Sequence, residues 1–440
     1  MKSRILVCIL VIVALGFYTQ YGIADDFDWP RWRGPNGDGI SMEADWDPEA
    51  LHRGPKILWK VNVGMGHSNV VIKGKYLYTM GHEGLISDKV SEDTVYCLKV
   101  KNGKTAWQYS YSCISGKWGM GTQVTPVIDG SYVYTLSIQG DFFCFNAKKG
   151  MVQWKNNIVE DYDVQIPLYE FAGSPVIEGD LIILTANTSG IALNKNTGEM
   201  VWVSEKPPEN LRLPYSTGPH YATPVLYEYE GKRCAVITSY VGVHSVEVET
   251  GKLLWSYKWE PEWEPFRAVQ AADPLIFNNK VFITQYFKHN GSVLLDIGGG
   301  EPKVLWKNLN MHSEFSSPLM IDGYIYGVRG GPERRLYSYL CLDVETGEVM
   351  WEEDLRTREK QVRPNQVSLM AADGKLIILE DDGTLRIAEA SPSSYKEISS
   401  GNVFGDERKS RSFWTHPVLC NSKIYCRNRA GDLVCVDVSK

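Results

Sequence analysis

The sequence predicts an all-β protein, folded as a single eight-bladed β-propeller of four-stranded antiparallel blades. Three observations predict it: a repeat of about 48 residues, a strand-and-turn segment that occurs eight times, and a C-terminus that lacks the last strand of its blade. A period of this length suits four short strands with their turns. Because one such sheet buries its faces only by stacking on neighbours, a single propeller accounts for 440 residues without several domains.

The repeat is marked by Gly-x-x-x-Trp at the end of a predicted strand. The glycine allows a tight turn, and the indole offers a flat surface that packs between blades. Two blades depart from the motif. The fifth stretches the spacing between Gly300 and Trp306, and in the seventh, which has no such tryptophan, Tyr395 is expected to stand in. The predicted docking residues are Trp59, Trp107, Trp154, Trp202, Trp255, Trp306 and Trp351.

The second signal is an apolar pair, a turn and an alternating strand pattern. Its eight copies predict the first two strands of each blade, and they begin at Asn69, Thr125, Ser174, Thr223, Asp273, Ser317, Leu369 and His416. The chain ends at Lys440, soon after the eighth copy, whereas the segment around Trp59 precedes the first copy. We therefore expect this N-terminal strand to complete the last blade and remove its free edge.

The chain divides into three parts. Residues 1–24 have the charged start, apolar stretch and small-x-small end of a cleavable signal peptide. Residues 25–55 are expected to form an N-terminal arm, and residues 56–440 the propeller. The sequence therefore predicts a secreted or periplasmic protein, with no membrane span after signal removal.

The net charge of the chain argues against nucleic-acid and membrane partners. Cleavage of the signal removes two cations and no anions, so the net charge of −7 becomes −9, and we find no polybasic run. A nucleic-acid or anionic-membrane partner is therefore not expected.

Four cysteines occupy one repeated strand position, where a small buried side chain is expected. The disulfide pairing of the eight mature cysteines stays open. The four are Cys97, Cys144, Cys341 and Cys435.

Polar and aromatic residues precede the innermost strand of each blade, at the predicted mouth of the central channel. Such a mouth offers stacking surfaces and hydrogen bonds for a planar or sugar-like ligand. The alternative is a solvated funnel. The candidate ligand-binding residues are His67, Gln123, His220, Tyr221, Gln270, Glu314, Gln366 and Trp414.

Catalytic and metal-binding signatures are missing from the sequence. We find no Walker loop, no His-Glu-x-x-His and no Gly-x-Ser-x-Gly, and the histidines lack zinc-ligand spacing. The stretch from Asn36 to Gly39 is similar to a calcium loop, but Gly34 occupies the first ligand position, so a turn is expected. The sequence predicts no catalytic residue and no metal ligand.

The segments ETGKLLW and ETGEVMW resemble the tryptophan-docking motif of pyrroloquinoline-quinone (PQQ) repeat propellers. The opening DWPRWRGPNGDGIS, followed by GHSNVV, is similar to secreted bacterial members of that family. The resemblance covers nearly the whole mature chain and implies one of two functions. One branch resembles the propeller subunit of the outer-membrane barrel assembly machine, a non-catalytic scaffold. The other is the quinoprotein dehydrogenases, which bind PQQ and calcium.

This chain lacks the residues with which the dehydrogenases hold their cofactor and calcium. Their cofactor lies under a ring of two adjacent cysteines, and no two cysteines are adjacent here; a calcium-binding set cannot be placed either. We therefore expect a binding or scaffold propeller of the bacterial cell envelope, without a cofactor, that engages a protein or an envelope polymer. The alternatives are a PQQ- and calcium-dependent oxidoreductase and a binder of small molecules or glycans at the channel mouth. Oligomeric state is left open.

Overall fold

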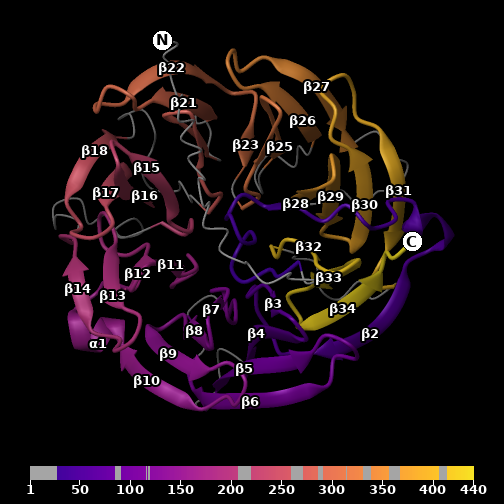
Figure 1. The fold of residues 1–440 in the computed structure, drawn as a ribbon. Coiled ribbons are helices and arrows are strands. Elements are labelled where there is room, and N and C mark those ends of the chain that lie inside the picture. The colour runs from indigo at the N-terminus through magenta and orange to yellow at the C-terminus, as the bar shows by residue number, and fades with distance from the viewer. Residues whose placement is uncertain are drawn as a thin grey trace, which may run out of the picture.

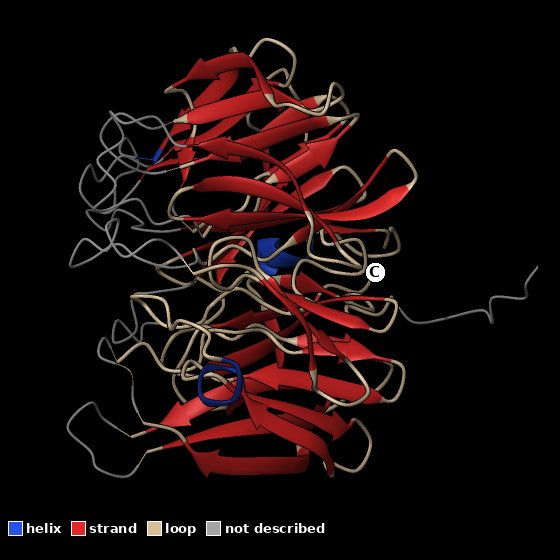
Figure 2. Cartoon of the chain, turned by 90° about the vertical axis from the view of Figure 1, so that its left-hand side faces the viewer, coloured by secondary structure: helices blue, strands red, loops and turns tan. Residues whose placement is uncertain are grey.

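The computed structural model describes residues 27–84, 91–114, 116, 119–206, 220–258, 271–285, 291–313, 315–330, 338–355, 367–405 and 414–440. Eight sheets surround a central axis (Figure 1), and each contains a four-stranded antiparallel unit. Seen edge-on, the strands cross the thickness of a disc (Figure 2). The predicted eight-bladed propeller is confirmed. The predicted signal peptide lies outside the described residues.

The blades follow one another in chain order, and within each the chain runs from the axis to the rim. Blade 1 contains β3 (Val71–Lys73), β4 (Tyr76–Glu83), β5 (Glu92–Lys99) and β6 (Thr105–Ser112). Blade 2 contains β7 (Val127–Asp129), β8 (Tyr132–Leu136), β9 (Asp141–Asn146) and β10 (Val152–Asn157). Blade 3 contains β11 (Val176–Glu178), β12 (Leu181–Leu184), β13 (Ile191–Asn194) and β14 (Met200–Val203). Blade 4 contains β15 (Val225–Tyr229), β16 (Lys232–Ser239), β17 (Gly242–Glu247) and β18 (Leu253–Lys258).

The second half of the ring repeats this order. Blade 5 contains β19 (Leu275–Phe277), β20 (Lys280–Thr284), β21 (Ser292–Asp296) and β22 (Lys303–Asn308). Blade 6 contains β24 (Leu319–Ile321), β25 (Tyr324–Gly330), β26 (Ser338–Asp343) and β27 (Val349–Asp354), and β23 (His312–Ser313) pairs in parallel with β25. Blade 7 contains β28 (Val367–Ala372), β29 (Lys375–Glu380), β30 (Thr384–Glu389) and β31 (Glu397–Asn402).

The eighth blade joins the two ends of the chain. Strands β32 (Val418–Leu419), β33 (Lys423–Arg427) and β34 (Asp432–Asp437) come from the C-terminus, and β2 (Lys56–Asn62) supplies the outer strand. Trp59 lies opposite Cys435 in this antiparallel pair. The predicted closure is therefore confirmed. Among the described residues the helices are α1 (Ile158–Tyr162) and η1 (Ala50–Arg53), and neither has the length to cross a membrane.

The docking tryptophans fasten each blade to the next. Six of the seven donate their indole N–H to a backbone carbonyl of the following blade, at 2.7–3.0 Å: Trp59 to Val100, Trp107 to Ala147, Trp154 to Lys195, Trp202 to Val248, Trp306 to Val344 and Trp351 to Ser391. Trp255 differs, because its indole donates to the Tyr227 hydroxyl of its own blade at 3.0 Å. The blade that follows Trp255 is blade 5, in which the spacing between Gly300 and Trp306 is longer than in the other copies of the motif.

The expectation for Tyr395 is wrong. Its ring packs on Trp351 of the preceding blade, with ring centroids 5.8 Å apart. In the register of β30 and β31, Ser399 takes the tryptophan position, opposite Ile387. The bulge between Ile387 and Ala388 matches the bulge of the other blades, so the register is regular and blade 7 simply has a serine in place of the indole.

The N-terminal arm replaces the missing eighth indole. The backbone N–H of Asp47 donates at 2.7 Å to the carbonyl of Val438, which is the residue of blade 8 equivalent to Val100 and Val344. The Ser399 hydroxyl donates to the Pro48 carbonyl at 2.5 Å. Trp46, 2% exposed, joins the apolar core that blades 7, 8 and 1 share. The arm thus fastens blade 7 to blade 8.

All eight described cysteines are buried, and they form no disulfides with one another. Cys97, Cys144 and Cys341 each lie directly opposite a docking tryptophan on the neighbouring strand, as Cys435 does. A small side chain at this place leaves room for the indole, so the cysteines of the repeat act in packing.

The glycine of the motif gives a direct test of docking. Gly150 has φ +68°, and a Cβ there would lie 2.6 Å from Cδ2 of the Trp107 indole. At Gly130, φ is +56° and a Cβ would meet nothing within 4 Å. We predict that Gly130→Ala costs about 1 kcal/mol, from backbone strain alone. Gly150→Ala should cost roughly 1–3 kcal/mol more, because the indole must shift. Urea denaturation of both variants measures this, and equal losses would contradict the docking role.

Candidate functional site

A ring of hydrogen bonds links neighbouring blades close to the axis. In each link, the backbone N–H of the residue two positions before an innermost strand donates to the side chain of its equivalent in the next blade. Five consecutive links measure 2.8–3.1 Å: Asn69 to Thr125, Thr125 to Ser174, Ser174 to Thr223, Thr223 to Asp273 and Asp273 to Ser317. A proline follows each of the five acceptor residues and holds its backbone extended. This geometry positions side-chain oxygens around the channel.

The N-terminal arm follows the inner ring of the propeller, where Figure 1 shows it in indigo near the centre. Trp29 pairs with Ile72 of blade 1, and the Pro30 carbonyl accepts a hydrogen bond from Ile128 of blade 2. Further along, β1 (Ile40–Ser41) pairs in parallel with β28 of blade 7. The arm therefore contributes residues to the axis itself, which its position before the first repeat did not reveal.

Two consecutive arm residues meet the acid of blade 5. The Trp32 indole donates to Asp273 Oδ2 at 2.7 Å, and Arg33 Nε lies 3.9 Å from the same oxygen. The Arg33 guanidinium also donates to the Asp38 and Pro318 carbonyls, both at 2.7 Å. Burial raises the pKa of Asp273, and the neighbouring Arg33 charge opposes that rise. Burial also lowers the pKa of Arg33. The pair fastens the arm to blades 5 and 6.

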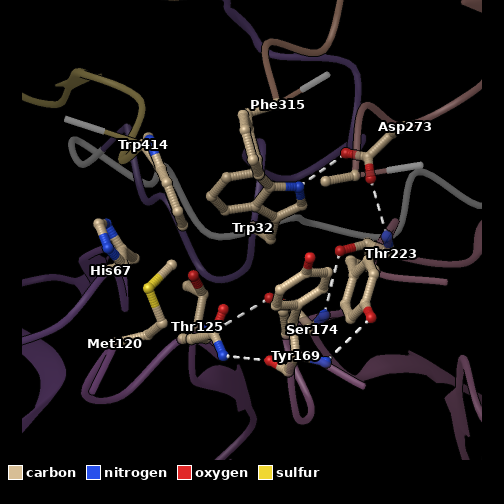
Figure 3. A pocket seen from close by; sticks show the side chains of 14 residues that line it. Trp32, His67, Met120, Thr125, Tyr169, Ser174, Thr223, Asp273, Phe315 and Trp414 are labelled. Carbon is tan, nitrogen blue, oxygen red and sulfur yellow. Dashed lines mark hydrogen bonds between the residues drawn. The ribbon is translucent and has the colours of Figure 1, made fainter. Parts of the chain in front are cut away.

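A cavity of about 230 Å³ lies on the axis beside Trp32 (Figure 3). Most of its wall is apolar and aromatic, and the hydroxyl-bearing ring residues Thr125, Ser174 and Thr223 line it too. The aromatic members of the wall are Trp32, His67, Tyr169, Tyr221, Phe315 and Trp414. We call this cavity the axial pocket.

Trp414 lies in an aromatic stack at one side of the axial pocket. The His67 ring stacks on Trp414, with ring centroids 4.1 Å apart, and Phe315 stacks on it at 4.3 Å. Burial, together with Arg429 and Arg427, lowers the pKa of His67 well below its usual value, so this imidazole is neutral. Both His67 ring nitrogens and the Trp414 indole nitrogen are buried without a hydrogen-bond partner in the part of the chain that the structure describes.

The structure brings together four of the eight candidate residues. His67, Gln123, Tyr221 and Trp414 line the axial pocket. Gln123 donates to the Tyr169 carbonyl at 2.7 Å, and the Tyr221 hydroxyl accepts from the Tyr169 N–H at 3.1 Å.

His220 is not among the residues that line the axial pocket. It is buried beside Tyr240, with ring centroids 6.2 Å apart. Gln270, Glu314 and Gln366 lie outside the described residues.

Sequence reasoning missed Trp32, Asp273 and the ring hydroxyls. A sequence pattern for Asp273 and the ring hydroxyls was present, because a serine, threonine or aspartate precedes a proline in five of the eight copies of the strand-and-turn segment. For Trp32 the sequence holds no corresponding sign, since the arm lies outside the repeat.

A metal site finds no support among the described residues, which contain no group of three or more His, Cys, Asp or Glu side chains placed to hold an ion. In the stretch from Asn36 to Gly39, Asp38 Oδ1 accepts a hydrogen bond from the Ile40 N–H at 2.9 Å. Gly37 and Gly39 have φ values of +72° and +79°. These are features of the turn expected there.

Four-stranded blades, indoles docked on the following blade and a shared closing blade define this chain as an eight-bladed propeller of the PQQ-repeat type. A family model described as "Outer membrane protein assembly factor BamB" matches residues 91–353. The chain belongs to this family.

Individual relatives are distant. The outer membrane protein assembly factor BamB of Yersinia pestis is 19% identical over 359 residues, which are 79% of this chain and 73% of the relative. The crystal structure of BamB from Moraxella catarrhalis matches with a TM-score of 0.58 and 14% identity, over 87% of this chain and 97% of that one. A europium-containing methanol dehydrogenase matches with a TM-score of 0.66 and 11% identity, over 93% and 89%. These structural likenesses show the fold alone.

Buried neutral histidines predict a stability that falls with acidity. Burial lowers the pKa of His220 and of His416 to about 3, and that of His244 to about 4. Below pH 6.5 the unfolded chain therefore binds protons that the folded chain does not. His220 and His416 should each lower the free energy of unfolding by roughly 1 kcal/mol per pH unit between pH 6 and pH 4, and His244 by less as the pH nears 4. Denaturant midpoints measured across this range test the slope.

A His220→Phe variant isolates one contribution. The aromatic replacement keeps the contact with Tyr240 but cannot bind a proton, so its stability should fall less steeply between pH 6 and pH 4. Parallel curves for the variant and the natural chain would show that His220 does not contribute.

Proposed function

We propose that this chain is a non-catalytic scaffold of the bacterial cell envelope that binds a protein partner of the outer-membrane assembly machinery. The observation that carries the proposal is the family match over residues 91–353, since the family is described by an assembly factor. Export through the predicted signal peptide, residues 1–24, belongs to the same proposal. The family description favours a protein over an envelope polymer as the partner.

The chemistry of the axial pocket supports a non-catalytic role. PQQ carries three carboxylates, so a site for it needs cationic side chains and, with calcium, several oxygen ligands. Within the described residues, Asp273 is the one formally charged side chain of the lining, and it is an acid. Both of its oxygens already accept hydrogen bonds, from Trp32 and from the Thr223 N–H. These residues do not fit PQQ with calcium.

The rim of the propeller offers a surface for a protein. The outer strands β2, β14, β22 and β27 end their sheets, so their outer edges present unpaired backbone groups. Apolar side chains beside the docking tryptophans are exposed on them, among them Ile57 with Leu58, and Val304 with Leu305. An extended segment of a partner can add to such an edge through backbone hydrogen bonds and cover these side chains.

The test uses the mature chain and the outer-membrane assembly machinery purified in detergent from the same bacterium. We expect the two to co-elute in size-exclusion chromatography. A pair of aspartates placed on one outer strand at a time, as in Val304→Asp with Leu305→Asp, should weaken binding about tenfold at the blade used. Gly299→Asp, in a turn of the same blade with open space around it, is the matched control.

Two results would overturn the proposal. One is the absence of any complex with the machinery. The other is a saturable binding heat with a new absorbance band when PQQ and calcium are titrated into the mature chain, which would instead support an oxidoreductase.

A further inference from the structure

We infer that the axial pocket binds one uncharged sugar ring, such as the terminal unit of a glycan. This is a second activity of the chain, on the axis rather than at the rim, and it does not depend on the proposed scaffold role. Three features of the pocket carry the inference: an arc of unused hydroxyl donors, an aromatic wall and a single lining charge, Asp273, that the neighbouring Arg33 offsets.

The arc of donors comes from the ring of hydrogen bonds. Thr125, Ser174 and Thr223 each accept a backbone N–H from the neighbouring blade. None of their own hydroxyl protons finds an acceptor among the residues that the structure describes. The three side chains line the pocket from consecutive blades and are 1%, 2% and 9% exposed. A buried donor without a partner lowers stability, so a ligand that supplies acceptor oxygens here gains affinity.

Further unpaired polar atoms belong to the same wall. His67, 6% exposed, carries one N–H donor and one acceptor nitrogen, and neither has a partner in the described part of the chain. The Trp414 N–H is unpaired as well. Donors and an acceptor on several sides of a small cavity match a ring that carries hydroxyl groups around its edge, because each hydroxyl both donates and accepts.

The aromatic wall of the pocket suits the apolar face of a sugar ring. A pyranose presents a face of C–H groups, which packs well on aromatic rings. Tyr169 and Tyr221 meet edge to face, with ring centroids 5.8 Å apart, and Trp32 lines the pocket from the arm (Figure 3). Both faces of Trp414 are already covered by His67 and Phe315, so Trp32, Tyr169 and Tyr221 are the stacking surfaces.

Charge and volume narrow the ligand class. The Arg33 guanidinium at 3.9 Å offsets the charge of Asp273, and burial keeps His67 neutral, so the described lining does not favour an ion. At about 230 Å³ the pocket is smaller than the roughly 300–1,000 Å³ typical of drug-sized ligands, which suits a single ring such as the terminal unit of a glycan. An aromatic amino-acid side chain would fill the apolar wall but leave the three hydroxyls unpaired.

The experiment is saturation-transfer NMR on the mature chain. The probes are glucose, galactose, mannose, xylose and N-acetylglucosamine, with N-acetylphenylalaninamide as the competing class. We expect saturable transfer to at least one sugar. Ser174→Ala removes a donor from the arc and should weaken that sugar about tenfold, whereas Ser174→Thr restores the hydroxyl and the affinity.

Ser317 provides the matched control. Its hydroxyl accepts the Asp273 N–H in the same ring at 2.9 Å but does not line the pocket. Ser317→Ala should therefore lose similar stability in thermal melting and retain sugar binding. The inference is overturned if no sugar saturates, if only N-acetylphenylalaninamide binds, or if the two alanine variants weaken the sugar equally. Failure here leaves co-elution with the assembly machinery unaffected, so the two proposals fail separately.

Discussion

Closure of the ring is the constraint on which the rest of this structure depends. A four-stranded sheet with two apolar faces is stable only between two neighbours, so every blade needs a partner on each side. Seven of the eight blades are built from consecutive residues, whereas the eighth is shared between β2 and the C-terminal strands. The pairing of Trp59 opposite Cys435 joins residues far apart in the sequence and leaves no blade with an open face.

The blades are fastened at two distances from the axis. At the rim, indole N–H groups donate to carbonyls of the next blade; near the axis, backbone N–H groups donate to side-chain oxygens of the next blade. The inner hydrogen bonds also leave donors on the wall of the axial pocket, because a hydroxyl that accepts a backbone N–H still carries its own proton. In the sugar site that we propose, structural and binding roles meet in Thr125, Ser174 and Thr223.

The N-terminal arm compensates for an irregular blade and completes the axis. Blade 7 has Ser399 where other blades have a docking tryptophan, and the Asp47 N–H with the Pro48 carbonyl restores the lost contacts. The same arm carries Trp32 and Arg33 to Asp273 at the axis. A segment outside the repeat is thus needed both for the last interface between blades and for the wall of the pocket.

The sequence by itself determined the number of blades, their strand order, the closing strand and the burial of the repeated cysteines. It could do so because turn glycines, strand alternation and the docking indoles are local patterns that recur at a fixed period. Four of the eight candidate residues, chosen from their place ahead of each innermost strand, line the axial pocket. Only the tertiary structure decided that Trp255 bonds within its own blade, that Tyr395 packs backward on Trp351, and that Trp32 reaches the axis. Trp255 and Tyr395 lie in blades that depart from the repeat, and Trp32 meets Asp273 across 241 residues from an arm outside it, so no periodic pattern predicts these contacts.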